Sequence, residues 1–141
     1  MKKKILFLCT HNSARSQIAE GLLRNLCGEK YEVFSAGTSP TIVSPEAIEV
    51  MKEIGIDIST HYSKDIKNFI GEDFEYVITL CGGNSKNCPF FPTKGISFHK
   101  EFEDPLSFPP GEERMKKFRE VRDKIKEWIE EFFCKEEKEK L

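Results

Sequence analysis

The fold is decided by Ile5-Leu6-Phe7-Leu8-Cys9-Thr10-His11-Asn12-Ser13-Ala14-Arg15-Ser16, a segment near the amino terminus. Its first four residues are all apolar, which is typical of a short strand buried on both faces of a parallel sheet. Apolar residues at helical spacing begin after Arg15, and Gly28 stands where a helix stop is expected. Residues 33–37 then predict a second strand. The chain therefore begins with a βαβ unit.

The same alternation continues along the chain. Ser44-Pro45 predicts a helix start, with serine as the cap and proline at the first helical position. Residues 76–80 and 95–98 predict two further strands. From residue 112, apolar side chains at three- and four-residue spacing predict one long amphipathic helix. We expect one α/β domain over residues 1–141, with residues 135–141 as a frayed tail.

Composition narrows the function classes. The 141 residues are 38% hydrophobic and 33% charged, with a net charge of −2, which suits one globular domain and disfavours a nucleic-acid binder. The sequence holds no apolar run long enough to span a membrane. The apolar run at residues 5–9 is too short for a signal peptide, so we expect a cytoplasmic protein. An odd number of cysteines, five, then argues against a disulfide framework and predicts that any disulfide is transient.

The segment that follows the first strand has the pattern C-x5-R-S. A tight loop at a helix N-terminus directs several backbone N–H groups to one point and can hold a tetrahedral oxyanion. Arg15 adds a bidentate donor, and the same field stabilises a Cys9 thiolate. Ser16 can donate to that sulfur, and Asn12 can hold the shape of the loop. The expected oxyanion-binding residues are Thr10, His11, Asn12, Ser13, Ala14, Arg15 and Ser16.

A simpler interpretation remains open at this point. Cys9 could be a buried cysteine at a strand end and Arg15 a surface residue, since C-x5-R alone is common by chance. The position between a strand and a helix favours the functional interpretation. His11 is expected to face solvent, and His61 and His99 stand isolated in the sequence. Without a cluster of ligands we predict no metal site.

The pattern C-x2-N-x2-R-S, together with Asp104-Pro105 late in the chain, resembles the low-molecular-weight protein tyrosine phosphatases. The resemblance implies a four-stranded parallel sheet of order 2-1-3-4 flanked by helices. It also implies that Cys9 is the nucleophile, that Arg15 binds the oxyanion and that Asp104 is the general acid. By itself, Asp104 would read as a turn residue before proline.

Two more cysteines change the expected reaction. Cys81 follows the third strand, so it should lie at the same sheet edge as Cys9, and Cys88 follows after six residues that include two glycines and two asparagines. This pair resembles the thioredoxin-coupled arsenate reductases built on the phosphatase fold, and the similarity covers nearly the whole chain. Leu106 stands where phosphatases usually carry an aromatic residue. The plainer alternative is one core cysteine and one incidental loop cysteine.

The resemblance implies a catalytic set of Cys9, Cys81, Cys88, Arg15 and Asp104, which reduces arsenate(V) to arsenite(III) through three thiols. The expected partners are arsenate, with phosphate or sulfate as competing oxyanions, and thioredoxin as external reductant; no cofactor is expected, and we expect a monomer. Some relatives bind potassium near the loop. Asn12, Glu20 and Ser35 match part of that set, but Tyr62 and Lys64 do not, so a tight site is not expected.

Two other functions remain open from the sequence. One is a phosphatase for phosphotyrosine or small phosphoesters that uses Cys9, Arg15 and Asp104. The other is an anion- or redox-sensing module without turnover. Only the reductase requires Cys81 and Cys88. The two remaining cysteines, Cys27 and Cys134, are expected to serve packing or to be incidental.

Overall fold

The computed structural model describes residues 2–81 and 91–134. Cys88 and the expected frayed tail at residues 135–141 lie outside the described residues. The elements in chain order are β1 (Lys3–Cys9), α1 (Arg15–Cys27), β2 (Tyr31–Gly37), α2 (Pro45–Lys52), η1 (Ile66–Phe69), β3 (Tyr76–Thr79), β4 (Ile96–His99), η2 (Pro105–Ser107), α3 (Glu112–Ile129) and η3 (Glu130–Cys134).

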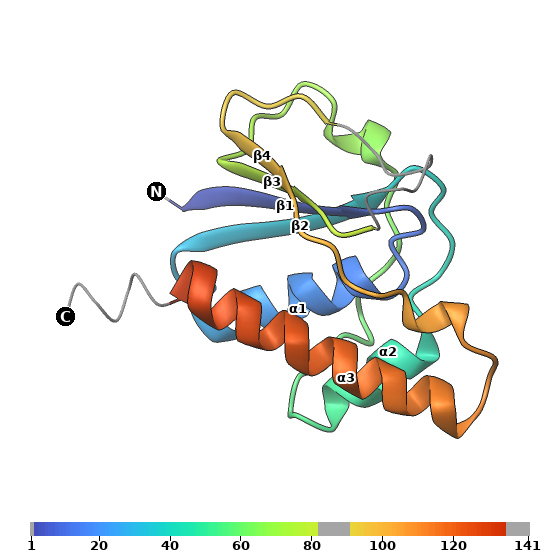
Figure 1. Cartoon of the computed structure of the whole chain (residues 1–141). Helices are drawn as coiled ribbons and strands as arrows, with labels where there is room; N and C mark the ends of the chain where they lie inside the picture. The colour runs from blue at the N-terminus through green and yellow to red at the C-terminus, as the bar shows by residue number, and fades with distance from the viewer. Residues whose placement is uncertain (1, 82–90, 135–141) are drawn as a thin grey trace.

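The four strands form one parallel sheet of order β2-β1-β3-β4, as the family resemblance implies (Figure 1). In its register, Cys9 lies beside Gly37 on one side of β1, and Leu8 lies beside Thr79 on the other. The carboxyl ends of β1, β2 and β3 therefore meet at one edge of the sheet. The expected long C-terminal helix is present, and it continues from α3 into the π-helical turn η3.

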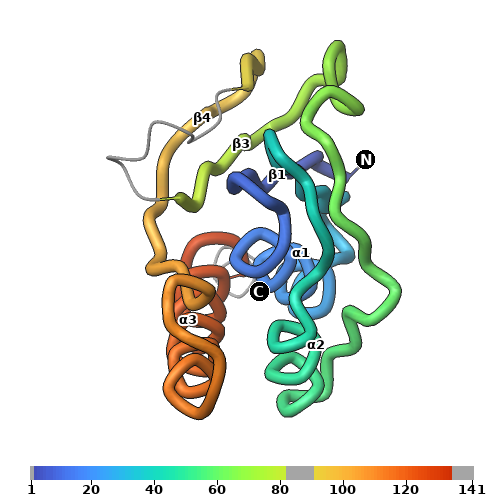
Figure 2. Tube along the Cα trace, turned by 90° about the vertical axis from the view of Figure 1, so that its right-hand side faces the viewer, coloured from blue at the N-terminus to red at the C-terminus, as the bar shows by residue number. Residues whose placement is uncertain are grey.

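Alternating residues of β1 supply two separate cores. Ile5 and Phe7 face the larger core, which α1, α2 and α3 close from one side of the sheet (Figure 2). Leu6 and Leu8 face the opposite side and pack with Phe69 of η1. Because both faces of the central strand are buried, its sequence is continuously apolar. This sandwich fixes the end of β1 rigidly against the start of α1.

The structure contains no helix, within residues 2–81 and 91–134, that is both long and apolar enough to cross a bilayer.

Candidate active site

Backbone carbonyls of the loop between β1 and α1 accept hydrogen bonds from the segment that follows β2. The carbonyls of Thr10, His11 and Ser13 accept hydrogen bonds from the backbone amides of Ser39, Thr41 and Ser44, at 2.9, 3.3 and 3.0 Å. In a trans peptide the N–H points opposite to the C=O. The N–H groups that follow these carbonyls therefore face away from the 39–44 segment. This arrangement fits the predicted anion cradle at the N-terminus of α1.

Cys9, at the end of β1, is 3% exposed, and its Sγ lies 2.8 Å from the Oγ of Ser16. The side-chain amide of Asn12 shows which of the two atoms, Cys9 Sγ or Ser16 Oγ, is the donor. Asn12 Nδ2 can only donate, and it donates to the same Ser16 Oγ over 2.8 Å. The single hydroxyl hydrogen of Ser16 is then available for the sulfur. The geometry thus allows Ser16 to donate to the Cys9 sulfur, which is the contact expected from the sequence.

Asn12 is the one non-glycine residue with a positive φ, 50°, in the part of the chain that the structure describes. Asparagine tolerates this left-handed conformation better than most residues. Its side-chain Oδ1 accepts from the backbone N–H of Lys64 at 2.8 Å and from Gln17 Nε2 at 3.0 Å, and its backbone carbonyl accepts from Ser63 Oγ at 2.8 Å. The predicted role of Asn12 as the brace of the loop is consistent with these contacts.

Gln17 supports Asn12 from behind, a role that the sequence did not predict. Its side chain is fully buried, and Nε2 also donates to the Tyr62 carbonyl at 3.0 Å. The Gln17 Oε1 lies 3.0 Å from Nδ1 of His61. Because a carbonyl oxygen can only accept, Nδ1 of His61 must carry a hydrogen.

His61 is isolated in the sequence, but the fold brings it into hydrogen bonds with Gln17 and Arg24. Its Nε2 lies 3.2 Å from Nη1 of Arg24, which can only donate, so His61 is held as the neutral imidazole with its hydrogen on Nδ1. Burial lowers the pKa of His61, and the charges of Arg24 and Lys64 act in the same direction against the opposing effect of Glu20. The neutral form of this histidine is therefore part of the support behind the loop.

Glu20 is 4% exposed and forms ion pairs with two basic side chains, Arg24 and Lys64. Its carboxylate lies 2.8 Å from Arg24 Nη1 and 3.4 Å from Lys64 Nζ, and Ser35 Oγ donates to it. Burial lowers the pKa of Lys64, while the neighbouring Glu20 partly offsets that effect. Of the residues that match part of a potassium set, Glu20 is thus occupied by the ammonium and guanidinium groups of the chain itself.

Gly37, at the end of β2, is needed for the close approach of the loop. A Cβ at this position would lie 2.5 Å from the Thr10 carbonyl oxygen, 2.8 Å from that of Cys9 and 2.9 Å from the Asn12 amide nitrogen. Backbone atoms cannot yield as a flexible side chain can, so only glycine fits. The sequence predicts that a strand ends at residue 37, but it does not predict how closely this strand end approaches the loop.

Arg15 and Asp104 come together although 88 residues separate them. Nη2 of Arg15 lies 3.6 Å from Oδ2 of Asp104, and Nη1 donates to the Phe102 carbonyl at 3.2 Å and to that of Leu80 at 3.5 Å. Asp104 caps η2, because its Oδ1 accepts from the Leu106 N–H at 2.9 Å, and Pro105 is buried beneath it. The geometry holds the carboxylate beside the loop.

Cys81 lies at the same sheet edge as Cys9. The Leu80 N–H donates to the Leu8 carbonyl at 2.8 Å, so Cys81 follows directly on the residue that flanks the end of β1. Cys81 is 2% exposed and is in disulfide form. Of the predicted catalytic set, Cys9, Arg15, Asp104 and Cys81 therefore share one edge, and Cys88 lies outside the described residues.

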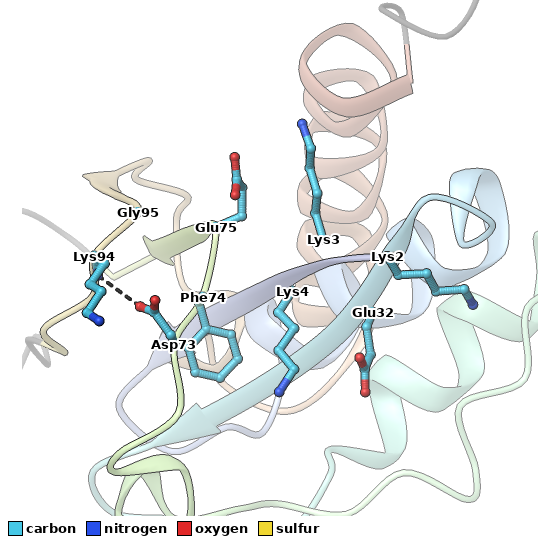
Figure 3. A pocket seen from close by; sticks show the side chains of 9 residues that line it. All are labelled: Lys2, Lys3, Lys4, Glu32, Asp73, Phe74, Glu75, Lys94 and Gly95. Atoms are coloured by element: carbon cyan, nitrogen blue, oxygen red, sulfur yellow. Dashed lines mark hydrogen bonds between the residues drawn. The ribbon is translucent and has the colours of Figure 1, made fainter.

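The amino ends of the strands, at the other end of the sheet, form a depression that contains no candidate nucleophile of the kind found at the carboxyl ends. A depression of about 620 Å³ lies there, and Figure 3 shows the lysine, glutamate and aspartate side chains around it. One of its interactions joins the Lys94 N–H to Asp73 Oδ1 at 2.9 Å. Its lining contains no cysteine or histidine. Residues 2–81 and 91–134 also hold no group of histidine, cysteine and carboxylate side chains suited to a metal ion.

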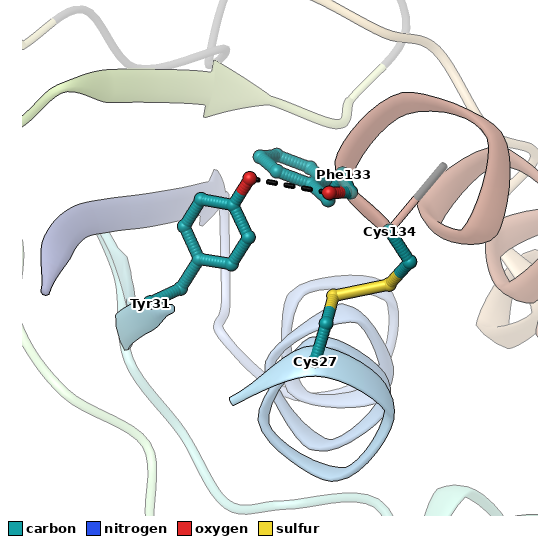
Figure 4. The surroundings of a disulfide bond; sticks show 4 residues. All are labelled: Cys27, Tyr31, Phe133 and Cys134. Atoms are coloured by element: carbon teal, nitrogen blue, oxygen red, sulfur yellow. Dashed lines mark hydrogen bonds between the residues drawn. A yellow bond between two sulfur atoms is a disulfide. The ribbon is translucent and has the colours of Figure 1, made fainter. Parts of the chain in front are cut away.

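Cys27 and Cys134 form a disulfide, with 5.9 Å between their Cα atoms (Figure 4). The prediction that these two cysteines serve only packing or are incidental is therefore wrong. Cys27 ends α1 and Cys134 ends η3, and the two cysteines are 107 positions apart in the sequence. No local sequence pattern indicates that two cysteines so far apart in the sequence lie close together in the fold.

The sequence matches, over residues 4–141, the family of low molecular weight phosphotyrosine protein phosphatases. The chain belongs to this family. The resemblance drawn from the loop and from Asp104-Pro105 is confirmed at this level, and so is the four-stranded parallel fold.

Within the family, proteins that are similar over nearly the whole chain include arsenate reductases, which confirms the second resemblance. The chain is 45% identical over 131 residues to "Arsenate reductase 2" of Staphylococcus epidermidis, covering 93% of this chain and 96% of that one. It is similar to the structure of an arsenate reductase in the phosphate binding state, with a TM-score of 0.77, 36% identity and coverage of 96% and 98% of the two chains. A thioredoxin-dependent arsenate reductase of Corynebacterium glutamicum matches with a TM-score of 0.65 and 30% identity, over 92% of this chain and 61% of that one.

Proposed function

We propose that this member of the family is an arsenate reductase that regenerates itself through a relay of three cysteines. The observation that carries the proposal is the position of Cys9, with its sulfur 2.8 Å from the Ser16 hydroxyl in a loop whose carbonyls are bonded to the 39–44 segment and whose N–H groups face away from it. Arsenate and phosphate have the same shape and charge. A homologous structure in a phosphate binding state therefore supports an oxyanion in this cradle.

In the first step, the Cys9 thiolate attacks arsenic(V) of arsenate held by the loop and Arg15. A new S–As bond forms as an As–O bond breaks, and Asp104 gives the proton with which the oxygen leaves as water. Arg15 is well suited to hold two of the remaining oxygens, because a guanidinium offers a bidentate pair of donors. Arsenic remains arsenic(V) at this stage.

In the second step, Cys81 attacks the Cys9 sulfur. The electron pair of the S–As bond passes to arsenic, which leaves as arsenite(III), and a Cys9–Cys81 disulfide forms. Cys88 then attacks the sulfur of Cys81 and frees the Cys9 thiolate. The resulting Cys81–Cys88 disulfide passes its oxidation to the two thiols of thioredoxin. The thioredoxin-dependent relative supports this choice of reductant.

The test follows NADPH consumption by thioredoxin reductase and thioredoxin with arsenate as substrate, beside hydrolysis of p-nitrophenyl phosphate. We expect sustained reduction of arsenate that requires thioredoxin. The Cys88→Ser variant should complete about one turnover and accumulate a Cys9–Cys81 disulfide, detectable by non-reducing peptide mapping. Multiple turnovers by Cys88→Ser would overturn the relay.

Cys9→Ser provides the second arm of the test, since the nucleophile serves both chemistries. It should abolish arsenate reduction and any phosphatase activity together. A wild-type protein that hydrolyses the phosphoester but never consumes NADPH with arsenate would instead identify a phosphatase. Leu106, which packs partly buried against the larger core, places an aliphatic side chain directly after Asp104-Pro105, where a phosphatase would usually carry an aromatic ring.

A further inference from the structure

We propose that the Cys27–Cys134 disulfide is a permanent covalent lock on the C-terminal helix, chemically separate from the catalytic thiols. The chain then contains two kinds of cysteine: three that exchange and two that do not. This inference goes beyond the proposed function, because it concerns a bond that no step of arsenate reduction uses.

The lock lies far from the loop. Cys27 is the last residue of α1, whereas Arg15, its first residue, borders the loop. Twelve residues of helix at 1.5 Å each separate them by about 18 Å. Disulfide exchange requires a thiolate in contact with a disulfide sulfur. Cys9 therefore cannot reach this bond while α1 remains folded.

The sulfurs are also shielded from a protein reductant. Cys27 is 5% exposed, and Cys134 is partly buried against the larger core. A large partner such as thioredoxin must bring its own sulfur to one of them. Attack at Cys27 would require the end of the folded helix α1 to move, whereas Cys81 lies outside any helix and directly precedes a glycine pair; this difference favours persistence of the Cys27–Cys134 bond.

The bond secures a helix end that aromatic packing has already placed. Phe133 packs edge-on against Tyr31 with 5.3 Å between ring centroids, and the Tyr31 hydroxyl donates to the Phe133 carbonyl at 3.2 Å (Figure 4). Trp128 lies 5.7 Å from Phe133 in the same cluster. These contacts bring Cys134 to Cys27 in the folded chain, so the disulfide does not need to distort the fold to form.

Formation of the bond balances as an ordinary exchange. Two thiols lose two protons and two electrons to a disulfide oxidant, which is released as a dithiol or as two thiols. The product closes a loop spanning 107 residues, from the end of α1 to the end of η3. A crosslink of that length removes much of the conformational freedom of the unfolded chain, so it should stabilise the fold substantially.

Thiol counting on the full-length protein tests the separation. The protein is reduced without denaturant by thioredoxin, thioredoxin reductase and NADPH, and is then alkylated with N-ethylmaleimide. We expect three adducts, on Cys9, Cys81 and Cys88, and a Cys27–Cys134 crosslinked peptide in the non-reducing digest. Denaturant with a strong reductant should raise the number of adducts to five. Five adducts without denaturant would overturn the proposal.

Thermal unfolding, followed by Trp128 fluorescence, tests the lock itself. Cys27→Ser, Cys134→Ser and the double variant should all melt about 10 °C below wild type in non-reducing buffer. The double variant should match the single variants, because the first serine already removes the bond. Strong reductant should bring the melting temperature of wild type to that of the variants, because it breaks the Cys81 disulfide in every protein and the Cys27–Cys134 bond in wild type alone. Equal melting of wild type and variants in non-reducing buffer would overturn the lock.

Arsenate reduction at 25 °C by Cys134→Ser supplies the remaining control. A kcat within about twofold of wild type is expected, since the relay sulfurs and the loop are untouched. A relay defect in this variant would contradict the separation of the two sets. Failure of arsenate reduction in wild type would instead count against the proposed function and leave the thiol count and melting shift as independent results.

Discussion

The carboxylate of Asp104 faces the guanidinium of Arg15 across 3.6 Å, and both stand at the sheet edge where Cys9 ends β1. The contact joins the late segment at η2 to the first loop of the chain. The side chain of Arg15 is 11% exposed, whereas that of Asp104 is 39% exposed. The arginine side chain is thus largely buried, whereas the aspartate carboxylate is accessible to a bound substrate.

Replacing Asp104 by Asn should lower kcat for arsenate about 100-fold, because an amide cannot give the proton to the leaving oxygen. KM should not rise, since the change removes negative charge from the neighbourhood of the oxyanion. Asparagine keeps an oxygen for the Leu106 N–H, so η2 should remain capped. Steady-state kinetics with thioredoxin coupling provide the measurement.

Glu103→Gln is the matched control for that experiment. Glu103 is the adjacent carboxylate, but it pairs with Lys117 on the surface over 3.1 Å. Its kinetics should remain close to those of wild type. An equal loss of kcat in both variants would show that the effect is a general one of charge and would remove Asp104 from the acid role.

Two substitutions of Asn12 should separate the effect of its conformation from that of its hydrogen bonds. Asn12→Gly and Asn12→Ala both lose the contacts to Ser16, Gln17 and the Lys64 amide. Only alanine also meets the steric penalty of a positive φ, so it should be less stable than glycine by about 1 kcal/mol in urea unfolding. Iodoacetamide should alkylate Cys9 more slowly in both variants, because Ser16 loses the donor that orients its hydroxyl.

Asn25, an exposed helical residue in the last turn of α1, provides a control in which the order of stability of the glycine and alanine variants should be reversed. In a helix interior glycine is less favourable than alanine by about 1 kcal/mol. Asn25→Gly should therefore be less stable than Asn25→Ala, with unchanged alkylation of Cys9. The same order of stability at both positions would contradict the conformational argument at Asn12.

Gly37→Ala should weaken oxyanion binding, because the new Cβ would displace backbone atoms of the loop. A displacement of about 1 Å at a reacting centre can lower the rate about 100-fold, and we expect a loss of at least about 10-fold in kcat/KM for arsenate. Ser39→Ala is the control, since its side chain is exposed while its backbone keeps the hydrogen bond to Thr10. Wild-type kinetics in Gly37→Ala would mean that the loop does not need this close approach.

The parts that the sequence predicted are those with a local signal. A continuous apolar run produced β1, the spacing of apolar residues produced α1 and α3, and C-x5-R-S at the junction of a strand and a helix marked the loop. Asp104 was found because Asp-Pro is a short motif whose meaning depends on the loop already recognised. Burial on both faces of β1 is the physical reason why its pattern is so clear.

The parts that were missed depend on contacts between distant segments. The role of Gly37 is a distance between two backbones, and the support of Asn12 by Gln17 and His61 joins residues 44 positions apart. The Cys27–Cys134 bond requires the ends of α1 and η3 to meet. None of these approaches is encoded by a spacing or a local preference, so a single sequence does not reveal them.

The neutral state of His61 predicts a pH dependence of stability. Its pKa in the folded protein is lowered from 6.5 by burial and by Arg24 and Lys64, against the opposing charges of Glu20 and Asp57. The unfolded chain then binds a proton more readily than the folded one. The stabilising contribution is complete above pH 6.5 and is lost as the pH falls through the lower folded pKa. A protonated ring would also turn a donor toward Arg24.

His61→Gln should flatten this dependence, because glutamine can still donate to Gln17 but does not titrate. Urea unfolding at about pH 7.5 and about pH 5.5 should show a smaller drop in the free energy of unfolding for the variant than for wild type. His99→Gln, on the exposed β4, should keep the wild-type drop. An unchanged drop in His61→Gln would show that other groups carry the acid sensitivity, and that His61 braces Gln17 without linking the loop to pH.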